Sequence, residues 1–126
     1  MLYTKRLLAA AAMTALLGLS QVVLAAEAPV KKSDGVLVNA SGMTLYTFDK
    51  DPEGKSVCNG PCAAIWPPLA AAADATPAGA YTVVTRDDGA KQWAHKGKPL
   101  YLWVKDQKPG DRTGDGFNGV WRVVKE

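Results

Sequence analysis

The sequence has few of the side chains that enzymes and metalloproteins use for chemistry. Its 126 residues include one histidine, His95, and two cysteines, Cys58 and Cys62. It contains no nucleophile elbow, phosphate-binding loop or zinc-protease motif. With a single imidazole, most general-base mechanisms would have to be built around His95. We therefore expect a protein that is not an enzyme.

Concentrated charge of one sign is also absent. There are 15 Lys and Arg residues against 12 Asp and Glu, and the two signs alternate along the chain, as at residues 49–51 and 106–108. Nucleic-acid binding depends on a basic patch that neutralises phosphates. This mixed distribution predicts a solvated surface and no nucleic-acid partner.

No apolar run comfortably reaches the length of a membrane-spanning helix, which is about 20 residues. The run at residues 7–19 follows the basic pair Lys5-Arg6 and precedes small residues at positions −3 and −1 of a cleavage site between Ala25 and Ala26. This order is typical of a secretory signal peptide. The alternative is an uncleaved N-terminal anchor.

Several expectations follow from a signal peptide at residues 1–25. The signal segment should form a helix that packs against nothing, and residues 26–33 should form a flexible tail. Cleavage would leave 13 of the 15 basic residues beside all 12 acids, so the exported protein would be nearly neutral. No cysteine near the cleavage site could carry a lipid. We expect a periplasmic or secreted protein with no stable membrane anchor.

What the sequence does contain is an internal repeat at a constant offset of 55 residues. Residues 42–51 align with residues 97–106 without a gap, and the register continues to a tryptophan in each copy. Six identities at one offset, two of them in rare aromatic residues, indicate a duplication. The matched pairs are Gly42 and Gly97, Leu45 and Leu100, Tyr46 and Tyr101, Phe48 and Trp103, Lys50 and Lys105, Asp51 and Asp106, and Trp66 and Trp121.

Both copies predict short strands around a glycine turn. In each copy, one extended run precedes the glycine and another follows it. Such runs, rich in β-branched and aromatic residues and bounded by turn residues, are typical of β-hairpins. These strands are predicted at residues 36–38, 45–48, 81–86, 91–95, 100–103 and 120–124. About 100 residues can bury one core. We therefore predict a mainly β domain over residues 34–126, in which repeats at 34–69 and 81–126 are joined by a linker at 70–80.

The aromatic residues of the repeat are expected to form its core. Side chains alternate along a strand, so the tyrosine and the following aromatic residue of each copy share a face, and each tryptophan should fold back onto them. The six rings are Tyr46, Phe48, Trp66, Tyr101, Trp103 and Trp121. The alternative is an aromatic face that binds a ligand. Asp51 and Asp106, just past each strand, are expected to accept backbone N–H bonds in their loops.

The two cysteines lie four residues apart in a loop of copy one. In an oxidising compartment, two neighbouring thiols normally form a disulfide, so we predict a structural Cys58–Cys62 bridge. Thr113 and Phe117 stand at the matching positions of copy two. This asymmetry indicates either a local staple or a role specific to copy one.

The alternative use of the cysteines is soft-metal or redox chemistry. Sulfur ligands suit Cu(I), and Cys58, Cys62, His95 and the thioether of Met43 would form a copper-binding set. Copper chaperones with such a set have alternating helices and strands, which this sequence does not predict. Residues 49–54 and 111–116 partly resemble calcium loops, but neither has a glutamate at the twelfth position, so polar turns explain both.

The motif Tyr-x-[Phe/Trp/Tyr]-x-x-Asp occurs twice, at Tyr46–Asp51 and Tyr101–Asp106, and copy one continues into the cysteine loop at residues 58–69. Together these features resemble the bacterial secreted-repeat proteins, often described as lipoproteins with this motif, over about residues 34–125. The resemblance implies an exported repeat protein of undetermined activity, and it supplies no catalytic residues. The chain differs from the lipoprotein members because it lacks a lipidation cysteine.

Two functional hypotheses follow. The first is an exported, non-enzymatic repeat module that is structural or ligand-binding and uses no cofactor. The second is a periplasmic redox or copper-handling accessory protein that uses the cysteine pair and His95.

Overall fold

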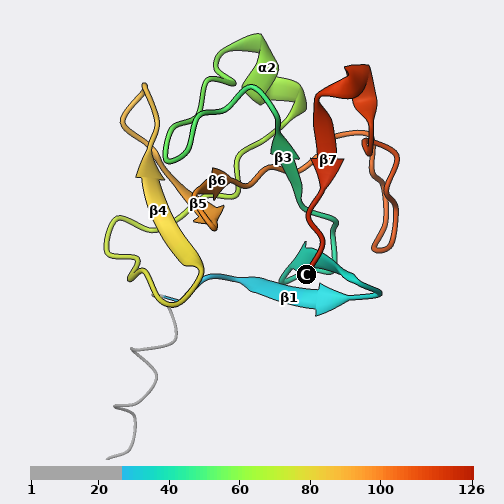
Figure 1. Cartoon of the computed structure of the whole chain (residues 1–126), viewed down its shortest axis with the longest axis horizontal. Helices are drawn as coiled ribbons and strands as arrows, with labels where there is room; N and C mark the ends of the chain where they lie inside the picture. The colour runs from blue at the N-terminus through green and yellow to red at the C-terminus, as the bar shows by residue number, and fades with distance from the viewer. Residues whose placement is uncertain (1–26) are drawn as a thin grey trace, which may run out of the picture.

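The structure is a computed structural model that describes residues 27–126 (Figure 1). The predicted signal peptide, its helix and its cleavage site lie outside the described residues. Short strands dominate the described part, and the predicted mainly β fold is confirmed. The elements are β1 (Val30–Ser33), β2 (Val36–Asn39), β3 (Tyr46–Phe48), α2 (Pro61–Ile65), β4 (Tyr81–Thr85), β5 (Lys91–His95), β6 (Lys98–Pro99), η2 (Phe117–Gly119) and β7 (Trp121–Val123).

The strands form three small antiparallel sheets: β1–β2, β3–β7 and β4–β5–β6. Tight turns set the registers. The β1–β2 turn has positive φ at both Asp34 (49°) and Gly35 (84°), and the β5–β6 turn repeats this at Lys96 (51°) and Gly97 (83°). Two consecutive positive φ angles give the twist of a two-residue hairpin turn. Within residues 27–126, no helix reaches the length and apolar character that crossing a membrane requires.

The expectation of a flexible tail over residues 26–33 is wrong for its second half. Val30–Ser33 is β1, which pairs antiparallel with β2 from Val30 opposite Asn39 to Ser33 opposite Val36. This strand was hard to predict because it contains two consecutive lysines, Lys31 and Lys32. It lies at the edge of its sheet, where these charged side chains are exposed. Charged residues on an edge strand are a common protection against aggregation.

The two repeats cross at the motif tyrosines. The Tyr46 N–H donates to the Tyr101 carbonyl at 2.8 Å, and the Tyr101 N–H donates to the Tyr46 carbonyl at 2.9 Å. The C-terminal strand β7 of copy two pairs with β3 of copy one, with Tyr46 opposite Val123. Figure 1 shows β3 and β7 side by side although residues 49–120 separate them in the chain. The copies are therefore interlocked.

The strand predicted at residues 100–103 is not a regular strand, in contrast to β3 at the matching place in copy one. Residues 100–102 do lie along residues 67–69: the Leu69 N–H donates to the Leu100 carbonyl at 2.8 Å, and the Leu102 N–H donates to the Pro67 carbonyl at 2.7 Å. Pro67 has no N–H to return to the Leu102 carbonyl, so this ladder is broken. The matching residues of copy two, Arg122 and Val123, keep their N–H groups and lie in the regular strand β7.

Buried side chains fall into two clusters. An aromatic cluster contains Val36, Val38, Tyr46, Cys58, Trp66, Tyr101, Trp103, Trp121 and Val123. A second, mainly aliphatic cluster contains Leu37, Leu45, Leu69, Trp93, Leu100 and Val124. Both clusters take residues from both copies, so the duplicated segments share one interior.

Candidate functional site

The motif tyrosine of each repeat bonds to the motif aspartate of the other repeat. The Tyr46 hydroxyl donates to Asp106 Oδ2 and the Tyr101 hydroxyl donates to Asp51 Oδ2, both at 2.6 Å. All four residues are buried. The motif therefore describes a reciprocal cross-connection that neither repeat could complete alone.

The second carboxylate oxygen of each aspartate holds its own loop. Asp51 Oδ1 accepts the Val57 N–H at 2.7 Å, and Asp106 Oδ1 accepts the Thr113 N–H at 3.0 Å. Burial raises the pKa of Asp51, while its hydrogen bonds from Tyr101 and Val57 oppose that rise. The two carboxylates are thus occupied on both oxygens.

Burial also raises the pKa of both motif tyrosines, and the hydrogen bond to an aspartate adds to the rise at each of them. A phenol with a raised pKa stays protonated at neutral pH and acts as a hydrogen-bond donor. These tyrosines are therefore poor nucleophiles and poor bases.

The repeat aromatics form a column of four stacked rings in the order Phe48, Trp121, Trp66, Trp103. Their successive centroids are 4.3, 3.7 and 3.9 Å apart. The column is symmetric with respect to the repeat: Phe48 and its counterpart Trp103 lie at the two ends, and Trp66 and its counterpart Trp121 lie between them. Tyr46 meets the edge of Trp66 at 5.3 Å, so the polar and aromatic parts of the motif are in contact.

Gly114 lies against the column, a role that no motif in the sequence indicates. A Cβ atom there would lie 2.8 Å from Trp66 Cη2 and 3.1 Å from Trp103. Its N–H donates to the Tyr46 hydroxyl oxygen at 3.2 Å. A side chain at this position would force the stacked rings apart.

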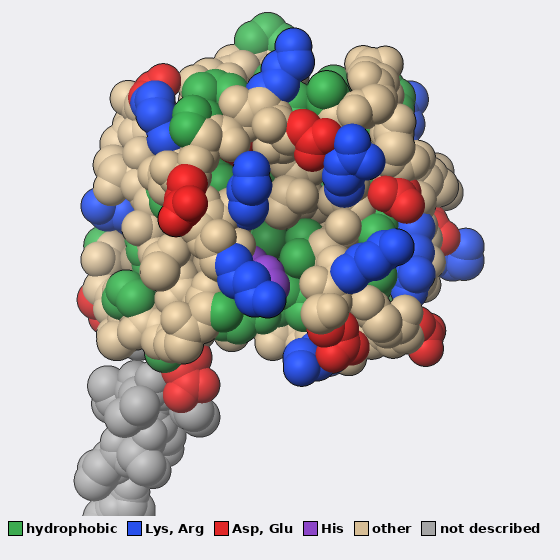
Figure 2. Space-filling model, viewed as in Figure 1, with side chains coloured by type: hydrophobic (Ala, Val, Ile, Leu, Met, Phe, Trp, Pro, Cys, Tyr) green, Lys and Arg blue, Asp and Glu red, His purple; other side chains and the backbone are tan. Residues whose placement is uncertain are grey.

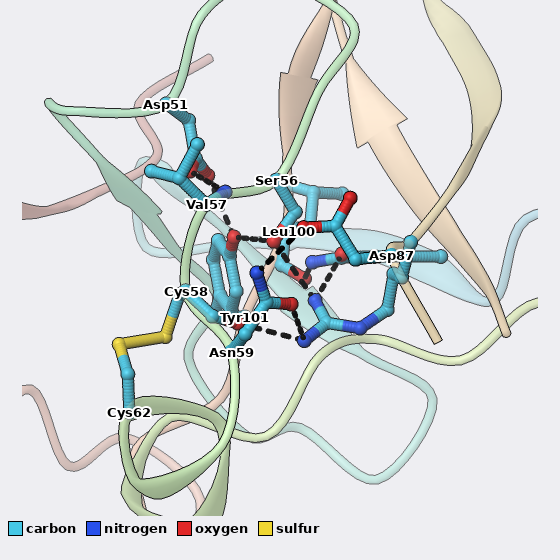
Figure 3. Close-up of a disulfide and its surroundings, with 11 residues drawn as sticks. Asp51, Ser56, Val57, Cys58, Asn59, Cys62, Asp87, Leu100 and Tyr101 are labelled. Carbon is cyan, nitrogen blue, oxygen red and sulfur yellow. Dashed lines mark hydrogen bonds between the residues drawn. A yellow bond between two sulfur atoms is a disulfide. The ribbon is translucent and has the colours of Figure 1, made fainter. Parts of the chain in front are cut away.

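Cys58 and Cys62 form a disulfide at the start of α2, with their Cα atoms 5.2 Å apart (Figure 3). Cys58 is fully buried, and its carbonyl accepts a hydrogen bond from Arg86 Nη2 at 2.7 Å. The bridge pins the loop that leads to Trp66. It also fixes a carbonyl that a basic side chain of copy two binds.

Arg86 is the main polar residue that sequence reasoning missed. Only 5% of it is exposed, and its guanidinium donates to Ser56 Oγ at 2.9 Å and to Gln92 Oε1 at 2.7 Å, besides Cys58. An arginine at the end of a strand, next to the turn at Asp87-Asp88-Gly89, resembles an ordinary solvated residue in sequence. The available signal was its spacing: Arg86 directly follows β4 and lies two residues after the buried Val84, so that in an extended chain both side chains point to the same face.

A chain of hydrogen bonds connects the Arg86 guanidinium to a carboxylate. The Tyr101 hydroxyl donates its hydrogen bond to Asp51. The Ser56 hydroxyl, 2.6 Å from that of Tyr101, must therefore be the donor to Tyr101, and it accepts a hydrogen bond from Arg86. Figure 3 shows Ser56, Tyr101 and Asp51 along this path. Among the ion pairs of residues 27–126, none involves Arg86. Its buried charge acts on the Asp51 and Asp87 carboxylates through space, and it is connected to Asp51 through aligned hydroxyl groups.

The remaining proposed metal ligands lie in other settings. His95 ends β5 and its ring centroid lies 5.1 Å from that of Tyr81. Met43 lies in the turn after β2, where its carbonyl accepts the Asn39 N–H at 2.8 Å. In the described part of the chain, no group of three or more His, Cys, Asp or Glu side chains could hold a metal ion.

The described surface has a hollow of about 270 Å³ between the β1–β2 hairpin and the β4–β5 hairpin. Its walls include Leu37, Tyr81 and His95, and Lys32, Lys96 and Glu126 also line it. Figure 2 shows the one histidine of the chain among apolar and basic side chains on this face. The residues that line the hollow come from both copies.

A larger hollow of about 590 Å³ lies beside the disulfide loop and is lined by Asn59, Arg86, Asp87 and Asp88. Its polar side chains already have partners: Asp87 accepts from Lys55 at 2.9 Å and from Asn59 at 3.0 Å. Asp88 Oδ1 accepts the Ala90 N–H at 2.9 Å. Its charged groups are thus used to hold the protein itself.

Comparison with known proteins supports the motif-based resemblance. The model of a family described as a secreted repeat of unknown function matches the chain twice, at residues 28–70 and 82–125. Searches of curated proteins and of solved structures give no match. The two matched segments together cover more than half of the chain. The chain belongs to this family of secreted repeats.

Proposed function

We propose that the protein is a non-enzymatic binding module of the periplasm or cell exterior. In this proposal, the duplicated motif builds the scaffold, and recognition occurs where the two repeats differ. One observation carries the proposal: the four polar motif residues Tyr46, Asp51, Tyr101 and Asp106 are buried and bonded to one another. Groups used up in this way have no free atom to offer a substrate.

The chemistry of the interior supports a scaffold in preference to an active site. Catalytic acids and bases work best with a pKa near the operating pH, whereas burial moves the pKa of Tyr46 and Tyr101 upward, away from neutrality. The stacked ring column fills the space beside them. The reactive side chains of the motif thus serve stability.

The disulfide supports an oxidising location. Such bonds persist in the periplasm and outside the cell and are rare in the cytosol. The bridge also holds the Cys58 carbonyl against Arg86, which gives it a structural use. This is consistent with the secreted character of the family.

The copper hypothesis requires the two sulfurs in reduced form. Cu(I) binding needs thiolates, and here the sulfurs are bonded to each other. Titration of the reduced protein with Cu(I) against a competing chelator separates the hypotheses. The binding module predicts no tight one-to-one complex. A tight complex that is lost in Cys58→Ser and weakened in His95→Ala would favour the accessory-protein hypothesis.

The test of the binding module is a chemical-shift titration of the ¹⁵N-labelled protein with small organic anions, organic cations and neutral sugars. We expect at least one class to give saturable shifts that map to residues not shared by the two repeats. Tyr46→Phe and Tyr101→Phe, checked for a native spectrum, should bind with unchanged affinity. The proposal fails if no class binds, or if a folded Tyr46→Phe variant loses binding.

A further inference from the structure

The hollow between the two hairpins has the chemistry of a ligand site. Leu37 is buried against it, and the rings of Tyr81 and His95, tilted by 43° to each other, form an aromatic wall. Lys32 and Lys96 contribute two ammonium groups against the one carboxylate of Glu126. Binding sites commonly combine apolar walls with a few polar groups that fix orientation.

The Tyr81 hydroxyl and the His95 imidazole of the hollow have no hydrogen-bond partner among the described residues. The pKa of Tyr81 is raised by burial, with the charge of Lys32 opposing the rise, and the pKa of His95 is lowered by burial and by Lys96. No hydrogen bond from a described residue contributes to either shift. The two lysines therefore act on the two rings through space, as they would act on an anion placed between them.

The Lys32–Glu126 pair does not close the hollow. The two charged groups are 3.2 Å apart, and the side chains are 68% and 37% exposed. Exposed pairs of this kind contribute little to stability. An incoming carboxylate can therefore compete with Glu126 for the Lys32 ammonium.

The backbone of Lys96 has an unusual conformation that hydrogen bonds hold in place. Its φ of 51° lies in the left-handed region, where Gly or Asn would be preferred at the first position of such a turn. The Lys96 N–H donates to the Ala80 carbonyl at 2.8 Å, and the Gly97 carbonyl accepts the Gly54 N–H at 2.7 Å. Strained residues that are held by their surroundings cluster at functional sites.

The residues of the hollow that come from the β5–β6 turn of copy two have no chemical equivalents in copy one. The Asn39 N–H bonds to the Met43 carbonyl, and His95 pairs with Lys98. The turn between these residues is one residue longer in copy one, so the offset before the turn is 56 and Asn39 is the counterpart of His95. Because Gly42 matches Gly97, Ala40 and Ser41 take the place of Lys96 in the longer turn. Copy one thus has neither the imidazole nor the ammonium, and the scaffold does not require them.

We propose that this hollow binds a small aromatic carboxylate, whose ring lies against Tyr81 and His95 and whose carboxylate is held by Lys96 and Lys32. The volume of about 270 Å³ is slightly below the roughly 300–1,000 Å³ of most ligand sites, which limits the ligand to about one substituted ring. This inference rests on the proposed binding function and names the class and the site.

Benzoate is the probe, and it is titrated into the ¹⁵N-labelled protein beside benzamide, which keeps the ring without the charge, and acetate, which keeps the charge without the ring. We expect benzoate to shift the signals of Tyr81, His95 and Lys96 and to saturate. Both control compounds should bind at least about fivefold more weakly, because each lacks one half of the interaction.

Variants test the two ammonium groups separately. Lys96→Asn removes the charge and suits the positive φ, and Lys32→Gln removes the other charge. Each should weaken benzoate binding about two- to fivefold, which is the range for an exposed ion pair. Lys105→Gln removes an exposed lysine that does not line the hollow, and it should leave binding unchanged.

The outcomes separate this inference from the broader proposal. Equal binding of benzoate and benzamide, unchanged binding in both lysine variants, or shifts confined to other residues would overturn the aromatic-carboxylate site. If a different class from the wider panel binds elsewhere, the binding module stands without this site. If nothing in the panel binds, both proposals fail.

Discussion

Replacing Tyr46 by Phe tests whether the repeats are joined through their motif side chains. The change removes one oxygen from a fully buried residue and keeps the ring against Trp66. It breaks the 2.6 Å bond to Asp106 and leaves the Gly114 N–H, 3.2 Å away, without that acceptor. A hydrogen bond to a charged group contributes about 1.5–3 kcal/mol. We expect the free energy of unfolding to fall by about 2–3 kcal/mol.

The cross-repeat geometry makes a sharper prediction for pairs of substitutions. In a double-mutant cycle, Tyr46→Phe should couple to Asp106→Asn by about 1–2 kcal/mol, which is typical of residues in direct contact. It should couple to Asp51→Asn, in its own repeat, by less than about 0.5 kcal/mol. Urea unfolding followed by tryptophan fluorescence gives these energies by linear extrapolation.

Tyr81→Phe is the matched control, because this tyrosine is only half-buried and no hydrogen bond contributes to its raised pKa. It should change stability by less than about 0.5 kcal/mol. The reasoning is refuted if Tyr46→Phe is as mild as this control. It is equally refuted if Tyr46 couples to Asp51 as strongly as to Asp106.

Three further predictions concern the same network. Replacing Cys58 and Cys62 together by Ser should lower the free energy of unfolding by about 2 kcal/mol, since so short a loop restricts the unfolded chain only modestly; thermal unfolding with and without reductant measures this. Arg86→Met should lower it by about 3 kcal/mol, because the Ser56, Gln92 and Cys58 acceptors lose their buried donor, and urea unfolding measures it, with loss below 1 kcal/mol as the contrary result. The stability that Tyr46 and Tyr101 contribute should be fully present below about pH 10 and be lost as the pH rises further, because their raised pKa values keep them protonated in the folded state while the unfolded chain ionises. Absorbance at a phenolate wavelength should then rise together with unfolding, whereas ionisation of all tyrosines before unfolding would contradict the burial argument.

The duplicated aromatic residues were predictable because they recur at one offset. Tyr46, Phe48 and Trp66 have the same spacing as their counterparts in copy two, and such a pattern can be seen in the sequence alone. From it we predicted the two repeats and the mainly β fold. This pattern does not indicate which copy supplies the hydrogen-bond acceptor for each tyrosine hydroxyl. The exchange of hydrogen bonds between Tyr46 and Asp106 is a property of how the two copies cross, so sequence reasoning could assign the aspartates only to their own loops.

Other features were missed because their local sequence imitates something ordinary. Lys31 and Lys32 resemble a solvated tail, yet they lie in an edge strand. Pro67 and Pro68 permit an extended segment beside residues 100–102 but prevent a regular ladder. Arg86 has the sequence context of a surface charge and becomes buried because partners from distant loops converge on it. Each error arises where tertiary contacts override a local pattern.

The division between shared and unshared residues bears on how the fold came to be used. Each motif tyrosine is buried and finds its acceptor only in the other copy. A lone repeat would leave its phenol without an acceptor and one carboxylate oxygen without its donor. A buried group without its partner costs about 1–3 kcal/mol, in a domain whose total stability is expected to be about 5–15 kcal/mol. The pair of copies is therefore the smallest unit that satisfies the motif. Positions that obey the repeat are constrained by this mutual requirement. His95 and Lys96 stand where copy one has Asn39 and the turn residues Ala40 and Ser41, so they are free of it and available for recognition.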